Sequence, residues 1–480
     1  MHPAWSLLPP AVALAVAFGT RRVLLALGAG ALTGFALLGV AQRGLVGLAS
    51  APVAFVGEGL LGQASAAGNA QVLVLVALIA GFVHRYEVSG AAAGLVQGLS
   101  RVVTTERRAE GAAFLGGLTL FFSDTGNVLL LGPLFRPVFD RLGVARERLA
   151  WVVDSTAAPV SVLVPFITWG VYITGLLDGA FGEGEGLALF AAAWPHQLYP
   201  WLCLFFVLGM ASVGRPFGPM ASASTLGQAT EEAGVGSFVA GVVPLAVLLV
   251  VLGAVGTALW LDDGVLRGPD VRLALGCGYL AAILALWALA PDEGFGRDVL
   301  SGMGGSARLL VLLVLAWSLG GVCKTLGTGA ALASLVGPWL PAAAVPVSVF
   351  LVGGLVSFAT GTSWGTFAIL LPLTAPLAEA TGIAPELLVG AVLSGGIFGD
   401  HSSPISDTTL LASAACGVDH GEHVRTQLPY AVVVGSCAGL GFVASGLWGA
   451  GLAVGGAGVV AVVLGSRAMR WSRGAGSGRG

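Results

Sequence analysis

Residues 399–408 read Gly-Asp-His-Ser-Ser-Pro-Ile-Ser-Asp-Thr, in the middle of an otherwise apolar stretch from 386 to 415. Three more polar interruptions occur, at residues 123–127 (Ser-Asp-Thr-Gly-Asn), 154–159 (Asp-Ser-Thr-Ala-Ala-Pro) and 360–366 (Thr-Gly-Thr-Ser-Trp-Gly-Thr). Each combines glycine or proline, which break helices, with hydroxyl, amide or carboxylate groups. Broken backbone at membrane depth is tolerated only where protein or water satisfies the freed amides and carbonyls. The interruptions therefore predict discontinuous helices around a polar site.

The composition predicts an all-α integral membrane protein. Of 480 residues, 56% are hydrophobic and 10% are charged, whereas a soluble domain carries about 25% charged residues. A helical span needs about 20 apolar residues, and such stretches recur along the chain. Hydropathy predicts about eleven transmembrane helices, near residues 4–20, 23–41, 69–84, 149–177, 186–211, 236–260, 271–291, 307–324, 386–415, 427–447 and 449–466.

Two other apolar stretches, 109–135 and 345–378, carry a polar interruption at their centres. Arginines flank the first stretch on both sides, and positive charge collects on the cytoplasmic side of a membrane. We therefore expect both stretches to be re-entrant hairpins. The N-terminus is then outside and the C-terminus cytoplasmic in the inner membrane. All of the 22 basic residues lie inside except Arg43, Arg267, Arg272 and Lys324.

The two halves of the chain resemble each other in order. Gly116-Gly117-Leu118 matches Gly353-Gly354-Leu355, and a polar interruption follows in each half. The matches continue with Pro133 and Pro372, Pro137 and Pro376, Asp140 and Glu379, Glu147 and Glu386, and Pro159 and Pro404. An odd number of spans per half makes the repeat inverted, with the site at the midplane where the interruptions meet. The predicted units are repeats over 1–213 and 236–447, a cytoplasmic linker over 214–235, and an extra helix with a basic tail over 448–480.

Four carboxylates are candidates for the site: Asp124, Asp154, Asp400 and Asp407. Each costs at least about 2.5–3.5 kcal/mol at the bilayer centre, so a bound cation or proton is expected to offset the charge. A structural alternative remains for Asp154 and Asp407, since either could cap a half-helix N-terminus. Asp400 could instead lie at the edge of its interruption, where water reaches it.

Hydroxyl groups beside these carboxylates are further candidates, since hard cations such as Na⁺ bind oxygen. Serine and threonine in apolar helices also commonly bond to the backbone of their own helix. Both interpretations stay open for Ser155, Thr156, Ser402, Ser403 and Thr408.

The aromatic and histidine residues allow similar alternatives. His401 is a candidate proton or ion ligand, or a satisfied core histidine. Trp169 and Trp364 are expected to serve packing. His420 and His423 are expected on a solvated cytoplasmic loop, although pH sensing there is an alternative.

The residues of 361–382 (GTSWGTFAILLPLTAPLAEATG) and 395–431 (GGIFGDHSSPISDTTLLASAACGVDHGEHVRTQLPYA) resemble the C-terminal signature of NhaC-type sodium/proton antiporters, in the ion-transporter superfamily. Residues 121–160 resemble the family's matching segment in the first half. The resemblance implies cation/proton exchange at a site formed by Asp124, Asn127, Asp154, Thr362, Ser363, His401, Ser402, Ser406 and Asp407. The first hairpin departs from the family pattern, because Ser123 stands where a second acid usually lies.

Two functions follow from these observations. The first is Na⁺(Li⁺)/H⁺ antiport, with Na⁺ bound at Asp154, Asp407 and neighbouring hydroxyls, including Ser155, Thr156 and Thr408, and with no cofactor. The alternative is Na⁺- or H⁺-coupled transport of a small carboxylate or amino acid, such as malate/lactate exchange; Ser123 favours it by lowering negative charge. An intramembrane enzyme is disfavoured, since an HxxP spacing (His401 to Pro404) is its only hint. The lipid bilayer and a second copy in a homodimer are possible partners; nucleic acid is not.

Overall fold

The computed structural model describes residues 3–95, 103–212, 214–223, 236–263, 268–328, 331, 341–449 and 451–474. All regular elements in these ranges are helices, which confirms the predicted all-α class. The α-helices of the first half are α1 (Leu8–Thr20), α2 (Val23–Arg43), α3 (Gly47–Ala54), α4 (Gln63–Ser65), α5 (Ala67–Val88), α7 (Glu106–Thr119), α8 (Asp124–Arg141), α9 (Arg146–Thr156), α10 (Ala158–Ser161), α11 (Thr168–Phe181), α12 (Gly186–Ala193) and α13 (Leu198–Ser212). Those of the second half are α14 (Phe238–Asp263), α15 (Gly268–Leu289), α16 (Phe295–Gly305), α17 (Ala307–Thr325), α19 (Val345–Thr360), α20 (Ser363–Thr381), α21 (Pro385–Ser402), α22 (Asp407–Cys416), α23 (His420–Trp448) and α24 (Gly451–Gly474).

Among the described residues, 7 helical runs are long and apolar enough to cross a membrane, and shorter apolar helices accompany them. The chain is therefore a multi-pass membrane protein. Three expected spans are not single helices. The stretch 149–177 is broken between α9 and α11, 386–415 is broken between α21 and α22, and 186–211 is interrupted by a 3-10 turn, Trp194–His196.

Some helical segments were not expected from hydropathy. After α2 the chain turns at Gly44, whose φ of 65° favours glycine. It then folds back as α3, which packs against α2, and continues through a π-helical segment, Phe55–Gly62. Glu58 and Gln63 hid this segment from a hydropathy search. The short α16 was missed for a similar reason, since its charged and glycine residues lower its mean hydropathy. The last helix, α24, continues to Gly474, beyond the expected end at 466.

Each expected hairpin consists of two packed helical arms, α7 with α8 and α19 with α20. The start of α9, which follows α8, lies against the start of α7, because Arg148 of α9 forms ion pairs with Glu106 and Glu110 of α7. The matched prolines lie at equivalent places, inside the second arm of each hairpin. The depth of the hairpins in the bilayer stays a prediction.

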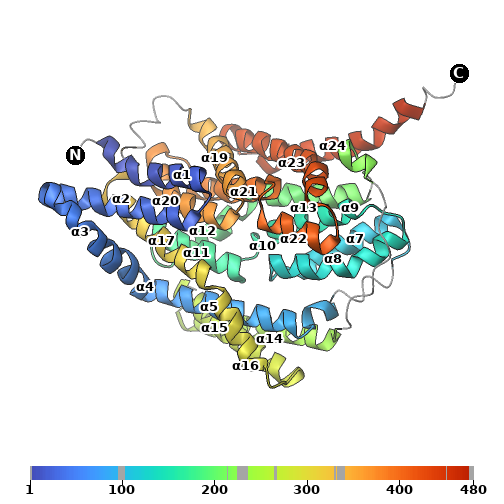
Figure 1. Ribbon diagram of the computed structural model, residues 1–480, viewed down its shortest axis with the longest axis horizontal. Helices are drawn as coiled ribbons and strands as arrows, with labels where there is room; N and C mark the ends of the chain where they lie inside the picture. Colours follow the sequence, from blue (N-terminus) through green and yellow to red (C-terminus); the bar gives the residue numbers. More distant parts are fainter. Residues whose placement is uncertain are drawn as a thin grey trace.

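Helices of the two halves interleave in a symmetric pattern (Figure 1). In the first half, α5 packs against α15 and α16 of the second half as well as against α11 of its own half. In the second half, α17 packs against α2 of the first. The hairpins also contact the opposite half, because α8 packs against α22 and α20 packs against α11. Each broken helix therefore packs on the hairpin of the other half as well as on that of its own half. The repeat boundaries at 213 and 236 stay a prediction, and residues 224–235 of the expected linker lie outside the described residues.

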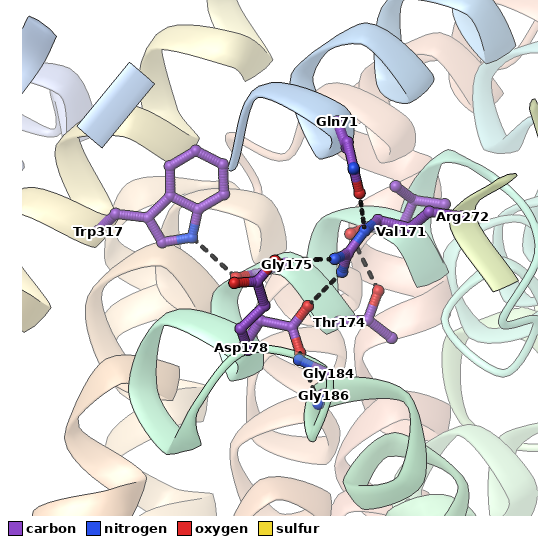
Figure 2. Close-up of polar contacts among 10 residues, drawn as sticks. Gln71, Val171, Thr174, Gly175, Asp178, Gly184, Gly186, Arg272 and Trp317 are labelled. Carbon is purple, nitrogen blue, oxygen red and sulfur yellow. Dashed lines mark hydrogen bonds and ion pairs between the residues drawn. The ribbon is translucent and has the colours of Figure 1, made fainter. Parts of the chain in front are cut away.

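Buried arginines hold α5 and α15 together at both ends. At one end Arg272 of α15 donates to Asp178 Oδ2 of α11 (2.7 Å) and Gln71 Oε1 of α5 (3.0 Å). Figure 2 shows this junction, in which Asp178 also accepts from the backbone amides of Gly184 and Gly186. At the other end Arg85 pairs with Asp292 and Asp298.

We predict that Arg272→Met destabilises the protein by about 3–5 kcal/mol, because it leaves the buried Asp178 carboxylate without its cation. Both side chains of this pair are nine-tenths buried (10% and 11% exposed). The measurement is the thermal unfolding midpoint of the purified protein in detergent. The matched control is Arg425→Met, since Arg425 forms an exposed pair with Glu422 and such pairs contribute roughly 0–1 kcal/mol. Equal midpoints for the two variants would contradict the assignment.

Candidate functional site

The two broken helices meet at their interruptions. In the first half α9 ends at Thr156, and Ala157 leaves the helical conformation (φ −82°, ψ −92°) just before Pro159. In the second half α21 ends at Ser402, and Ser403 is extended ahead of Pro404. The half-helix that follows, α22, packs against α9. Polar ends of helices from both repeats therefore share one region of the protein interior.

Asp154 lies at the centre of this region, in the last turn of α9, and is 1% exposed. Its Oδ2 accepts hydrogen bonds from Thr409 Oγ1 (2.8 Å) and Gln427 Nε2 (2.6 Å). No ion pair joins it to any residue that the structure describes. Its position at a C-terminal helix end excludes the N-cap alternative. The carboxylate is thus held by neutral donors alone.

His401 is buried beside Asp154 and is held on three sides. Its Nε2 lies 3.2 Å from Ser155 Oγ and its Nδ1 lies 2.7 Å from Tyr199 Oη. Its backbone carbonyl accepts from Gln427 Nε2 (2.9 Å), so the same amide bridges His401 and Asp154. The two repeats are joined here through side chains predicted for the site and through Gln427, which was not.

Asp400 caps a hairpin arm. Its Oδ2 accepts from the backbone amide (3.2 Å) and Oγ (2.8 Å) of Ser363, the first residue of α20. A carboxylate at this position is stabilised by the helix dipole. Asp400 is only 2% exposed, so the alternative of a water-accessible edge position is wrong. Its other oxygen, Oδ1, is buried with no hydrogen-bond partner.

Asn127 ties the first hairpin to the break in α9. Its Nδ2 donates to the carbonyls of Gly117 (2.9 Å) and Thr156 (3.0 Å). Its Oδ1, like that of Asp400, is buried without a partner. Amide and carboxylate oxygens are ligands that hard cations prefer. These two oxygens are therefore available to a bound cation.

Asp124 and Asp407 stand at the start of two helices that pack together, α8 and α22 (Figure 1). Ser123 and Ser406 cap these helices, each accepting from an amide of the first turn. Neither aspartate is the N-cap itself. Asp407 is exposed and Asp124 is half-buried, and their charges are close enough to repel each other.

The four carboxylates lie close enough for their charges to interact, and one arginine acts on Asp407. Asp400 lies within electrostatic range of both Asp154 and Asp407. Arg308, at the start of α17, acts on Asp407 with the opposite sign. Asp154 and Asp407 share no direct hydrogen bond; the first turn of α22, through Thr409, connects them. A common Na⁺ at both carboxylates stays a prediction.

The other predicted hydroxyls have local partners. Thr156 donates to Val152 O and Ser402 to Phe398 O, each within its own helix. Ser406 Oγ lies 3.0 Å from Thr408 Oγ1. Thr362 precedes α20 without a side-chain capping bond. Their roles in binding stay predictions, although each oxygen keeps a lone pair for a cation.

The predictions for the tryptophans and for the later histidines had different outcomes. Trp169 and Trp364 pack with 4.4 Å between ring centroids and their planes tilted by 50°, as expected for packing. His420 and His423 do not lie on a solvated loop, because they occupy the first turn of α23. His423 is fully buried. The signal was in the sequence, since Asp419 caps α23 by accepting from the amide of Glu422 (3.1 Å) and Asp-x-x-Glu before an apolar run marks a helix start.

Comparisons with known proteins identify the family of this chain. A model of the Na⁺/H⁺ antiporter family matches residues 162–447. The chain belongs to the Na⁺/H⁺ antiporter family. An uncharacterized protein of Haemophilus influenzae is 30% identical to it over 94% of this chain and 92% of its own length.

Other relatives of this family member match locally. The Na⁺/H⁺ antiporter NhaC of Alkalihalophilus pseudofirmus is 40% identical over 17% of this chain and 18% of its own, which confirms the NhaC-type resemblance. A malate-2H⁺/Na⁺-lactate antiporter of Bacillus subtilis is 40% identical over 20% of this chain and 24% of its own. Among solved structures, the YdaH transporter of Alcanivorax borkumensis shares the fold (TM-score 0.57, 17% identity, 84% of this chain and 88% of the other).

We predict that Thr409→Val destabilises this antiporter-family protein by about 1–3 kcal/mol, because a buried carboxylate loses a donor. The control is Thr374→Val, which also removes a buried hydroxyl, but one that donates only to Leu371 O of its own helix. Thermal unfolding in detergent measures both. A loss no larger for Thr409→Val than for Thr374→Val would show that the Asp154 contact is not stabilising.

Proposed function

We propose that this protein exchanges Na⁺ or Li⁺ for H⁺ across the inner membrane, with Asp154 as the shared binding group. The observation that carries this proposal is the environment of Asp154, a carboxylate buried at the junction of two broken helices without a cationic partner. An ionised carboxylate in this setting costs at least about 2.5–3.5 kcal/mol. A sodium ion or a proton removes that cost, and only one of them can do so at a time.

The other groups would complete the coordination of the cation. Asp400 Oδ1 and Asn127 Oδ1 are buried oxygens with no protein partner. Ser155, Thr156, Thr362, Ser363, Ser402, Ser406 and Thr408 supply hydroxyls nearby on the same helix ends. His401 positions Ser155 through its Nε2 and is itself positioned by Tyr199. Asp124 and Asp407, more exposed, would attract cations toward the site.

Exchange requires that the site open to one side at a time. Discontinuous helices paired with hairpins in inverted repeats are the usual architecture for such alternating access. The interleaved helices of this chain support this proposal, because each broken helix packs on the other half's hairpin. We place the N-terminus outside and the C-terminus in the cytoplasm, following the arginine distribution, and we retain a homodimer as a prediction.

A second candidate, coupled transport of a small carboxylate or amino acid, is favoured by one observation. Arg308 is exposed and its charge acts on Asp407, the first residue of α22. A cationic side chain and helix N-termini together suit a carboxylate. The malate/lactate antiporter among the relatives is consistent with it. If this function holds, Arg308→Gln would abolish solute transport.

Enzymatic chemistry finds less support. Ser155 Oγ and His401 Nε2 lie at hydrogen-bond distance, as a nucleophile and its base would. Ser155, however, is fully buried and His401 is 4% exposed, so a peptide has no approach to the pair. We propose no covalent step.

We predict that proteoliposomes with an internal pH dye and an imposed pH gradient release protons when Na⁺ or Li⁺ is added, but not when K⁺ is added. Asp154→Asn removes the charge and should abolish the response. Asp262→Asn, a change at an exposed carboxylate near the end of α14, should leave it intact. No response of tight vesicles to any cation would exclude antiport. Malate, lactate and amino acids would then be screened in the same vesicles.

A further inference from the structure

A second cluster of ionisable groups lies beside the site, where α22 ends and α23 begins. Ser413 Oγ lies 3.1 Å from His420 Nδ1 and 2.9 Å from His423 Nδ1. His423 Nε2 lies 2.9 Å from Gln427 Oε1. Because Gln427 Nε2 donates to Asp154, only one residue separates the imidazole of His423 from the central carboxylate.

The outer contacts of the two imidazoles fix where their hydrogens lie. His420 Nε2 is 2.7 Å from Pro404 O, a carbonyl that can only accept. The amide of Gln427 is oriented by its two acceptors, Asp154 Oδ2 and His401 O, so its Oε1 faces His423 and accepts as well. Both imidazoles therefore carry hydrogen on Nε2.

With these tautomers, too few hydrogens lie between the two rings to satisfy every acceptor there. If both imidazoles are neutral, both Nδ1 atoms are acceptors, and they face the same hydroxyl. Ser413 Oγ has a single hydrogen, for which Thr409 O (2.7 Å) also competes. One added proton removes the conflict, because a protonated Nδ1 donates to Ser413 Oγ and the hydroxyl donates to the other ring.

We propose that His420, Ser413 and His423 form a proton-binding site that holds one proton between two imidazoles and releases it when a cation binds at Asp154. The first part follows from the hydrogen count. The second part rests on the proposed antiport. Only Gln427 separates Asp154 from His423, so the negative charge of Asp154 attracts a proton on the pair, and a sodium ion at Asp154 cancels that attraction.

The surroundings of the pair agree with proton uptake from one side. His420 is half-buried, while Pro404 and Glu422 beside it are exposed, so protons reach the outer ring. His423 is sealed. Among the charged and titratable groups of the packed elements, Asp154 of α9 and His401 of α21 interact with His423. Arg136 of α8 and Arg146 of α9 lie near Gly417, just ahead of α23, and Asp419 and Glu422 flank His420 in the sequence.

The test is ¹⁵N NMR of imidazole-labelled full-length protein in lipid nanodiscs, with His420→Gln and His423→Gln used to assign the two rings. We expect one imidazolium for the two rings near neutral pH. Added Na⁺ should discharge it at constant pH, and K⁺ should not. Two neutral rings throughout the pH range of about 5–8, where histidine normally titrates, would overturn the proton site.

Transport measurements test the role in exchange. Ser413→Ala and His420→Gln should lower Na⁺-driven proton release at least about tenfold, as for loss of a proton-transfer group, while Na⁺ still binds. His84→Gln, which lies outside the cluster, should have no effect. Wild-type rates with an unchanged pH profile in both variants would overturn the role. If wild-type vesicles show no exchange, the proposed function fails, whereas the NMR titration still decides the proton site.

Discussion

A buried carboxylate without a positive partner is the constraint on which the rest of the structure depends. Asp154 is held by Thr409 and Gln427, which donate hydrogen bonds but bring no charge. Arginines do neutralise carboxylates elsewhere in the fold, as Arg272 does for Asp178 and Arg85 for Asp298. Around Asp154, no described arginine or lysine forms such an ion pair. A fixed arginine there would satisfy Asp154 permanently, whereas neutral donors leave the charge for an exchangeable ion.

The interleaving of the two halves explains how such a site is built. Each broken helix packs on the hairpin of its own half and on an arm of the opposite hairpin. Asn127 closes the break of α9 through the carbonyl of Thr156, and Asp400 caps α20. The groups that stabilise the breaks also bring the candidate ion ligands together. Under the proposed function, stability and binding therefore depend on the same few side chains.

Sequence reasoning found the polar breaks, the two pairs of helical arms and the aspartates beside the breaks, since each break combines a helix breaker with polar groups in an apolar context. It did not find Gln427, Thr409 or Tyr199. A single amide or hydroxyl in an apolar helix forms no recognisable motif, and its partner is known only from the tertiary structure. The place of His423 was predicted wrongly, because two histidines, an arginine and acids within 419–425 outweighed the capping signal at Asp419. Hydropathy also joined segments that proline and backbone geometry separate, as in 149–177.

The central claim, that one buried carboxylate binds Na⁺ and H⁺ in competition, is tested most directly without transport. Calorimetric titration of the purified protein with Na⁺, in buffers of different ionisation enthalpy, counts the protons released for each ion bound. The account predicts proton release on Na⁺ binding, and loss of both binding and release in Asp154→Asn. Sodium binding without proton release, or binding unchanged in Asp154→Asn, would contradict it.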